Sequence, residues 1–175
     1  MRESGVLLPV ASLPSAYGIG CFSREAYAFV DWLKAAGQSC WQILPLGPTG
    51  YGDSPYQSFS TFAGNPYFID LEDLIERGML TREFCDNFDF GDQEEYIDYG
   101  KIYRSRFQVL KEAWKNSQIA QNEDFRAFVQ ENAYWLKDYA LYMAVKDSLE
   151  GVCWTEWDED IKLRRPEALK QDRQQ

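Results

Sequence analysis

Residues 41–71 read WQILPLGPTGYGDSPYQSFSTFAGNPYFIDL, and this stretch decides how the chain is interpreted. It overlaps residues 35–69, a window in which Asp53 is the single formal charge among many aromatic residues, glycines and prolines. We expect a buried strand that ends at Leu44 and then a long loop over residues 45–66. Loops of that length inside compact domains are usually functional or disordered. Disordered segments are poor in aromatic residues and rich in charge, so this loop is predicted to be ordered.

The composition of the loop indicates the kind of ligand it would bind. Sugar hydroxyls need hydrogen-bond partners, which hydroxyl and amide side chains provide, and the apolar face of a pyranose ring needs a flat surface to cover it. An uncharged loop rich in hydroxyls, amides and aromatic rings suits a neutral polyol. The loop therefore predicts a carbohydrate site.

The residues before the loop follow a strand–helix–strand pattern. Residues 5–10 and 39–44 are short apolar runs typical of strands. Residues 24–36 have apolar positions at helical spacing, with Ser23 as the N-cap and Gly37 just after the end. Two strands joined by a helix imply a parallel pair. The fold class is therefore predicted as α/β, either a doubly wound sheet or a (β/α)8 barrel.

Helices dominate the sequence after the loop. Residues 67–70 are expected to form a strand and residues 71–77 a helix, and a longer helix is expected over 123–148. An apolar stripe is formed by Tyr103, Phe107, Leu110 and Trp114. We divide the chain into a βαβ start (1–78), a mainly helical insert subdomain (79–150) and a return segment with a truncated helix (151–175). A full barrel needs about 250 residues, so the chain is expected to be the front of a longer protein.

The overall composition excludes several classes of site. The net charge is −10, which disfavours binding to nucleic acid. The chain contains no histidine, which excludes Ser-His-Asp and Cys-His catalysis and any metal site that needs histidine. The four cysteines are widely spaced and are predicted to be buried thiols in a reducing compartment. No signal peptide or membrane span is predicted, so a cytoplasmic protein is expected.

Residues 41–71 closely resemble the 4-α-glucanotransferases, also called amylomaltases or disproportionating enzymes (glycoside hydrolase family 77). The resemblance extends over residues 12–14, 17–20, 98–103 and 138–144, and thus over nearly the whole chain. One departure is Asp158, because in this family the second Trp of Trp154-x-x-Trp157 is usually followed by Pro. The resemblance implies that the chain is the N-terminal part of a (β/α)8 barrel with helical insertions.

The resemblance also implies an activity. Such enzymes cut an α-1,4 bond in a glucan, hold the donor as a glycosyl-enzyme and pass it to the 4-hydroxyl of another sugar. This retaining chemistry needs a carboxylate nucleophile and a carboxylic acid about 5–5.5 Å apart. In this family both residues lie on later barrel strands, which places them beyond residue 175. No catalytic residue is therefore expected in this chain, and neither a cofactor nor a metal is expected.

Four loop residues are candidates for contact with the donor sugar. By resemblance Tyr56 lines the donor at the cleavage point, and the alternative is a packed loop tyrosine. Ser54 and Gln57 match motif positions beside it and either bind sugar hydroxyls or tie the loop together. Asp53 is retained as a candidate, although an Asp after Gly most often caps a turn, and we favour that structural role.

Aromatic residues outside the cleavage point are candidates for a secondary site. Tyr51 and Tyr103 match positions that could form a second glucan platform, and core packing is an equally good explanation for Tyr103. Trp154 and Trp157 form either a sugar platform or a seam between the insert and the barrel, and we favour the seam. The predicted partners are α-1,4-glucans, maltooligosaccharides and the missing remainder of the barrel. Two other functions stay open, an α-glucan hydrolase on the same barrel and a non-catalytic glucan-binding module.

Overall fold

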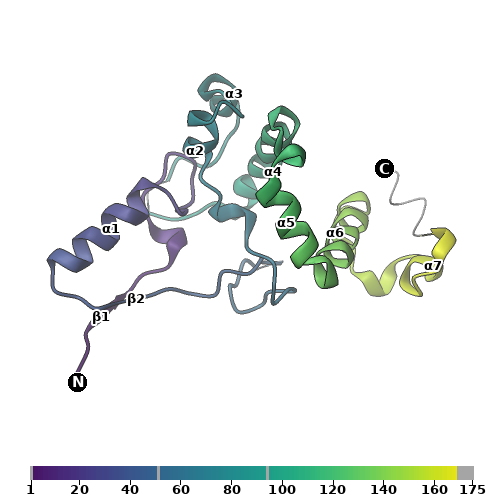
Figure 1. Cartoon of the computed structure of the whole chain (residues 1–175), viewed down its shortest axis with the longest axis horizontal. Helices are drawn as coiled ribbons and strands as arrows, with labels where there is room; N and C mark the ends of the chain where they lie inside the picture. The colour runs from purple at the N-terminus through teal and green to yellow at the C-terminus, as the bar shows by residue number, and fades with distance from the viewer. Residues whose placement is uncertain (1, 51, 94, 169–175) are drawn as a thin grey trace. The chain divides into compact units, whose positions relative to one another are not determined.

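The computed structural model describes residues 2–50, 52–93 and 95–168, and its helices and strands are labelled in Figure 1. The chain forms two compact units, Met1–Gln118 and Ile119–Gln175. The subdivision into 1–78, 79–150 and 151–175 stays a prediction.

The first unit begins with a parallel pair of short strands, β1 (Gly5–Leu7) and β2 (Cys40–Gln42). Helix α1 (Arg24–Ala35) connects them and lies close to both (Figure 1), so the predicted strand–helix–strand pattern is confirmed. The strands are shorter than the predicted ranges 5–10 and 39–44. The first is short because Pro9 has no N–H to donate, and the 3-10 helix η1 (Val10–Ser12) follows directly.

A small apolar cluster fixes α1 to the strand pair. Ala26 of α1 is buried together with Val10 and Leu13, and Trp41 of β2 packs against them. The Trp41 indole donates a hydrogen bond to the carbonyl oxygen of Leu8 at 2.8 Å. Its ring meets Phe29 of α1 edge to face, with the ring centroids 5.0 Å apart. Trp41 therefore links the strand pair to the helix, although it is only half-buried.

Residues 66–68, at the end of the long loop, form a 3-10 helix, η2 (Pro66–Phe68), and not part of the predicted strand 67–70. The Asn65 side chain accepts a hydrogen bond from the Tyr67 amide at 3.0 Å, and Pro66 occupies the first turn. An Asn cap followed by Pro is a helix-start signal, and here it prevails over the β propensity of the apolar residues that follow. Three α-helices complete the unit: α2 (Leu71–Glu76), α3 (Arg82–Asp86) and α4 (Tyr99–Asn116).

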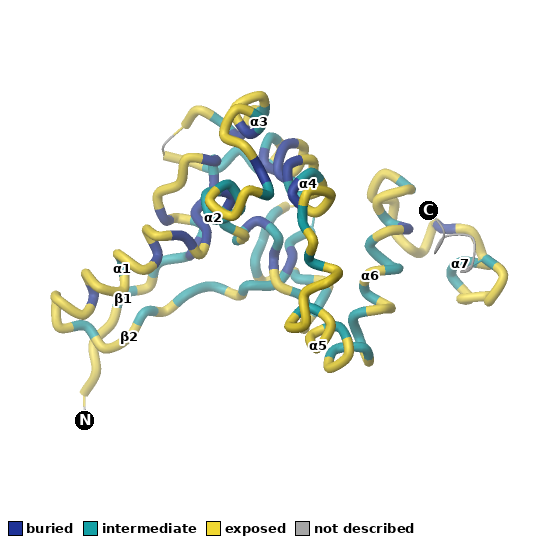
Figure 2. The backbone as a smooth tube through the Cα atoms, turned by 45° about the horizontal axis from the view of Figure 1, so that its top comes forward, coloured by how far each residue is buried: buried dark blue, intermediate teal, exposed yellow. Residues whose placement is uncertain are grey.

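The first unit has one main core cluster, which joins these helices to the segment before α1. The core cluster consists of Tyr17, Ile19, Tyr67, Leu71, Leu80, Cys85, Phe90, Ile102, Val109 and Ala113. Figure 2 shows the buried residues on α4 and on the segment before α1. Gly18 lets the segment before α1 approach the segment between α3 and α4, because an added Cβ would collide with the carbonyl oxygen of Phe90, and its φ is +73°.

The buried face of α4 differs from the predicted apolar stripe. Tyr103 and Trp114 are exposed, whereas the fully buried positions are Ile102, Arg106 and Val109. The stripe lies beside the buried face, because Tyr103, Phe107 and Leu110 each follow a buried residue by one position. The helix therefore buries a face that contains a charged residue, which a search for apolar residues alone does not find.

The second unit is helical and has little buried surface. Its helices are α5 (Glu123–Glu131), α6 (Ala133–Ser148) and the short α7 (Glu159–Lys162), together with the 3-10 helices η3 (Ile119–Gln121) and η4 (Trp154–Glu156). The single helix predicted over 123–148 is wrong, because it is interrupted at Asn132. The Asn132 side chain donates to the carbonyl oxygen of Phe128 and accepts from the Trp135 indole, both at 2.9 Å. Asn favours helix ends because its side chain competes for backbone hydrogen bonds.

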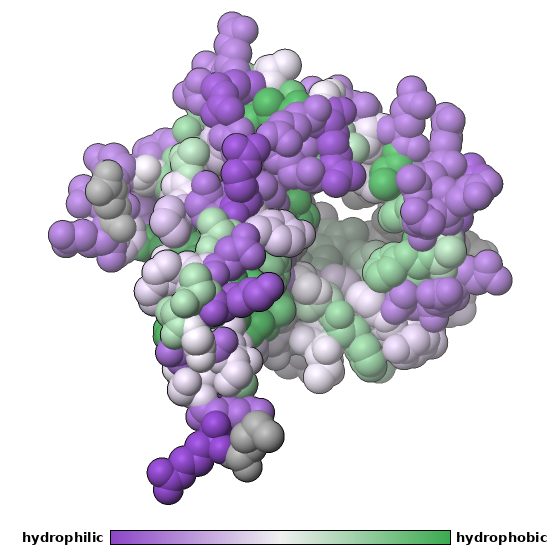
Figure 3. Space-filling view, turned by 60° about the vertical axis from the view of Figure 1, so that its left-hand side comes forward, coloured by the Kyte–Doolittle hydropathy of each residue, from purple (hydrophilic) through white to green (hydrophobic). Residues whose placement is uncertain are grey.

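Apolar side chains also reach the surface. On the face shown in Figure 3, apolar residues lie between hydrophilic ones.

Of the four cysteines, Cys21 and Cys85 are buried, but Cys40 and Cys153 are exposed, so the prediction of buried thiols is wrong for two of them. All four are free. No helix in the described part of the chain is long and apolar enough to cross a membrane.

Candidate functional site

The loop over residues 45–66 is closed at its neck by backbone contacts. The Asn65 amide donates to the carbonyl oxygen of Leu46 at 2.8 Å, which brings the two ends of the loop together. Asn65 is itself buried, and its side chain starts η2. The hydrogen bond between Asn65 and Leu46 therefore fixes the two ends of the loop to each other, as predicted for an ordered loop.

Serine hydroxyls hold the second half of the loop. Ser58 donates to the carbonyl oxygen of Ser60 at 2.8 Å, and the Ser60 hydroxyl accepts from the amides of Phe62 and Ala63 at 3.2 and 3.0 Å. Gly47 packs directly on Ser58, where an added Cβ would collide with the hydroxyl. These hydroxyls are engaged by the loop itself and contribute to its shape.

The predicted donor-contact residues, unlike the serines of the second half of the loop, do not use their side chains to hold the described part of the loop. Ser54 and Gln57 form a backbone turn, in which the Gln57 amide donates to the Ser54 carbonyl at 3.1 Å. Within the described part of the chain their side chains make no hydrogen bond to protein. Tyr56 lies between them and is 73% exposed, so it is not a packed loop tyrosine. The turn thus presents a ring, a hydroxyl and an amide that the protein does not use internally.

Asp53 occupies a strained turn position in the same loop. Its φ is +53°, in the left-handed region, and its amide donates to the Gly50 carbonyl at 3.1 Å. Asp is one of the few residue types that tolerate this conformation. Its carboxylate is partly buried, and the loss of water raises its pKa. These observations agree with a role in the turn.

The structure brings Asp53 close to a group of tyrosines. Burial and then the Asp53 charge raise the pKa of Tyr67 to about 12, and the same two causes raise the pKa of Tyr99. Tyr67 lies 6.4 Å from Tyr99 and 5.9 Å from Phe107 between ring centroids. The Asp53 charge therefore acts on two phenol groups, Tyr67 of η2 and Tyr99 of α4.

The predicted secondary site consists of Tyr51 and Tyr103, and the structure describes only Tyr103. Tyr103 is 55% exposed, while one side of its ring meets Phe107 edge to face at 5.4 Å. It therefore combines packing with an accessible face. Tyr51 lies outside the described residues. Whether these two rings form one platform stays a prediction.

Sequence reasoning missed three residues at this site: Tyr67, Tyr99 and Arg106. The available signal for Arg106 was spacing, because Ile102, Arg106, Val109 and Ala113 recur at helical intervals and form the buried face of α4. A charge at such a position requires a specific environment, since an isolated buried charge is costly. Tyr99 was within a quoted motif but was not assigned a role.

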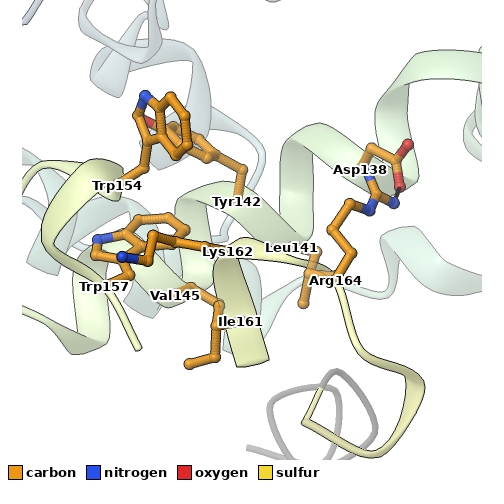
Figure 4. A pocket seen from close by; sticks show the side chains of 9 residues that line it. All are labelled: Asp138, Leu141, Tyr142, Val145, Trp154, Trp157, Ile161, Lys162 and Arg164. Carbon is orange, nitrogen blue, oxygen red and sulfur yellow. Dashed lines mark hydrogen bonds and ion pairs between the residues drawn. The ribbon is translucent and has the colours of Figure 1, made fainter. Parts of the chain in front are cut away.

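The second unit contains a separate pocket of about 250 Å³. Its walls come from α6 and from the segment 154–164, and Figure 4 shows Trp154, Tyr142 and Trp157 on one side and Asp138 with Arg164 on the other. Trp157 is buried against Tyr142, with ring centroids 5.3 Å apart, so it packs inside the second unit. Trp154 is 52% exposed. None of the predicted donor-contact residues lines this pocket.

The described residues do not provide a complete hydrolytic site. Asp53 is the single carboxylate of the loop, and its proximity to phenols rather than to a second acid gives no nucleophile–acid pair of the kind that glycosidic cleavage needs. No group of three or more metal-ligating side chains occurs among the described residues. The loop by itself therefore offers polar and aromatic groups but no pair of carboxylates.

Comparisons with known proteins show the family of the chain. A profile of the family described as 4-alpha-glucanotransferase matches residues 8–175. The 4-alpha-glucanotransferase of Clostridium butyricum is 49% identical over 161 residues, which cover 92% of this chain and 33% of that protein. The Thermus thermophilus enzyme is 47% identical over 174 residues, 97% of this chain and 34% of its own length.

A solved structure is also similar to the chain. The amylomaltase from Streptococcus agalactiae in complex with acarbose matches with a TM-score of 0.89 and 43% identity, over 99% of this chain and 36% of that one. The chain thus spans about a third of the length of the relatives it matches.

Proposed function

The chain belongs to the 4-alpha-glucanotransferase family, glycoside hydrolase family 77, and from this premise we propose that it supplies part of the donor site of such an enzyme. The complete enzyme would transfer a segment of an α-1,4-glucan to the 4-hydroxyl of another glucan or of glucose. Its α/β start would then be the first part of a (β/α)8 barrel. The predicted cytoplasmic location belongs to the same proposal.

The observation that carries the proposal is the turn at Ser54, Tyr56 and Gln57. The exposed Tyr56 ring stands between a hydroxyl and an amide that make no side-chain hydrogen bond to the described residues. Aromatic rings cover the apolar face of a sugar, while polar side chains pair with its hydroxyls. The surroundings are nearly uncharged, which suits α-1,4-glucans and maltooligosaccharides. The loop is closed at its neck, so these groups are presented with little conformational freedom to lose on binding.

In this proposal the loop contributes orientation and not bond cleavage. The retaining mechanism needs a carboxylate that attacks the anomeric carbon and an acid that protonates the departing oxygen, about 5–5.5 Å apart. The resemblance places both beyond residue 175. Tyr56 would hold the donor ring against these groups, and a contact that strengthens in the transition state would raise kcat.

The test is product analysis with maltotriose. The full-length protein that carries this chain should produce glucose and oligosaccharides longer than maltotriose, whereas a hydrolase would produce glucose and maltose alone. Residues 1–175 by themselves should produce neither above background, because both carboxylates are absent. Glucose release in proportion to the amount of this chain would overturn the proposal. Binding of maltooligosaccharide without turnover by the full-length protein would favour the glucan-binding module instead.

A further inference from the structure

Arg106 of α4 is the one charged residue among the buried residues of the described chain. Its side chain is 1% exposed, and it lies on the helix face that also buries Ile102 and Val109. An unpaired guanidinium in such a position costs several kcal/mol, so a buried Arg is normally held by specific partners. The partners of Arg106 therefore indicate what the residue does.

The guanidinium is bound at the point where the long loop ends. Nη2 donates a hydrogen bond to the carbonyl oxygen of Ile69, the residue directly after η2. Burial lowers the Arg106 pKa, and the neighbouring Cys21, Asp70 and Tyr67 side chains oppose this shift. The Cys21 thiol lies 3.8 Å from Asp70 Oδ1. Three segments of the first unit thus meet at Arg106: the segment at Cys21, residues 67–70, and α4 itself.

The cluster leaves the guanidinium incompletely paired. Nε and Nη1 are buried and have no hydrogen-bond partner among the described residues. Asp70 is shared, because its Oδ1 also accepts from the Glu72 amide at 3.0 Å and caps α2. An apolar side chain of similar length would avoid this desolvation cost and pack against Leu71, Ile102 and Val109. Buried ionic groups of this kind are a poor explanation for stability and a better one for geometric specificity.

The neighbours of Arg106 include the wall of the proposed donor site. Tyr67 is in the electrostatic range of both Arg106 and Asp53, and it packs against Tyr99 and Phe107 of α4. Residues 65–70 form the rear end of the loop, with Asn65 at the neck and Ile69 bound to Arg106. A displacement at Ile69 would therefore be transmitted along the η2 backbone to the loop.

We propose that Arg106 is a positioning residue for the donor loop: from α4 it fixes the Ile69–Asp70 backbone and, through it, sets Tyr67 and the neck of loop 45–66. This inference rests on the proposed function for its link to catalysis. Arg106 contacts no sugar in this proposal. It acts through the loop, which presents Tyr56.

The first test is kinetic and uses the full-length protein with maltotriose. Arg106→Met replaces the side chain by an unbranched apolar one and removes the hydrogen bond to Ile69, whereas Arg106→Lys keeps the charge and an ammonium group that can donate. We expect Arg106→Met to lower kcat by about tenfold or more, because small misplacements of a site are costly, with KM changed by less than about threefold. Arg106→Lys should recover a large part of kcat. Arg104→Met, an exposed arginine on the same helix, is the matched control and should behave as wild type.

The second test measures structure and does not need activity. Hydrogen exchange in the 175-residue chain should accelerate about tenfold at the Asn65 and Tyr67 amides in Arg106→Met, and should stay unchanged in α1 and in the Arg104→Met control. If Arg106→Met does not fold, Asp70→Asn serves in its place, because it keeps the cap acceptor and removes the charge beside Arg106. A smaller acceleration at the same two amides is then expected.

The outcomes separate this inference from the proposed function. Wild-type kcat in Arg106→Met, or uniform acceleration of exchange over the whole first unit, overturns the positioning role even if wild type transfers sugar normally. A loss of kcat that Arg106→Lys does not recover also counts against it. Absence of transfer by the wild-type protein would refute the proposed function, while the exchange experiment would still decide whether Arg106 holds the loop.

Discussion

The loop over residues 45–66 and the core cluster that follows it are both rich in aromatic residues, but they use them in opposite ways. In the core cluster Tyr17, Tyr67 and Phe90 are buried and pack on aliphatic side chains. In the loop Tyr56 and Phe62 are exposed, and the shape is maintained by hydrogen bonds that backbone amides donate to the Ser60 hydroxyl. Lack of charge in a sequence therefore does not mean burial. In the loop we propose that it provides a surface for a neutral ligand.

This difference predicts that mutations in the core cluster lower the free energy of unfolding, whereas mutations in the loop lower the rate of sugar transfer. Core residues contribute to the free energy of unfolding through buried apolar area. Exposed loop residues contribute little to it and are expected to affect sugar transfer. A loop variant that lowers the free energy of unfolding as much as a core variant would show that the loop and the core cluster are one structural element.

The largest effect is expected in the core cluster, at Leu71. Leu71 is fully buried at the start of α2. Leu71→Ala should lower the free energy of unfolding by about 3 kcal/mol, because it removes buried methyl groups and leaves a cavity. Leu163→Ala, at an exposed leucine, should change it by less than about 0.5 kcal/mol. Urea unfolding of the 175-residue chain measures both, and equal shifts would contradict the assignment of the core.

The next effect is expected in the loop, at Tyr56. In the full-length protein Tyr56→Ala should lower the transfer rate by about ten- to a hundredfold, equivalent to roughly 1.4–2.7 kcal/mol in the barrier. The free energy of unfolding should change by less than about 0.5 kcal/mol, because the ring is exposed. Rates on maltotriose, with Tyr51→Ala in parallel, provide the measurement. Normal transfer by Tyr56→Ala together with loss of transfer by Tyr51→Ala would reverse the roles of the two rings.

A smaller effect is expected where α4 begins. The Asp98 side chain accepts a hydrogen bond from the Lys101 amide at 3.0 Å and caps the helix. Asp98→Ala should destabilise the first unit by about 1 kcal/mol, and Asp98→Asn should remain close to wild type, because Asn is an equally good cap. Thermal unfolding compares the two variants. An equal loss in both would indicate that the charge of Asp98, and not the cap, is responsible.

The smallest effect is expected at Asp53, and it depends on pH. Burial raises the pKa of Asp53, so the folded state binds its proton more tightly than the unfolded state. The resulting cost is present at pH 7 and disappears as the pH falls below the unfolded value of 3.8. Asp53→Asn removes the charge and tolerates the positive φ, so it should stabilise the chain slightly at pH 7. Unfolding at pH 7 and at pH 3 checks this, and a gain of the same size at both pH values would exclude the charge as its cause.

Local signals in the sequence predicted the first unit well where they agreed with its packing. The helix expected over 24–36 is α1, because Ser23, the apolar spacing and Gly37 all define the same segment. The strand expected over 67–70 was wrong because the Asn65–Pro66 start signal was overlooked. The helix expected over 123–148 was wrong because the competition of the Asn132 side chain for backbone bonds was not considered.

The candidate site could be predicted only as far as its loop. The uncharged aromatic stretch indicated a sugar ligand, and the resemblance indicated Tyr56. The partners of the loop could not be read from local pattern, since Tyr67 and Tyr99 approach Asp53 only through the fold. Arg106 interrupts an apolar face, and a sequence gives no reason to prefer a buried Arg to an exposed one until its partner, the Ile69 carbonyl, is known.

The parallel pair of β1 and β2 has a consequence for the order of folding. Its register places Gly5 opposite Cys40. The two strands can therefore pair only after positions 35 residues apart (40 − 5) in the chain have come together. The helices α2, α3 and α4 follow one another through residues 77–81 and 87–98, which are shorter than that separation, so their contacts require less loop closure. Non-local pairing is slow, and local contacts form early. We therefore expect Val6→Ala to accelerate unfolding while leaving the folding rate nearly unchanged, which would make strand pairing the last step in assembling the first unit.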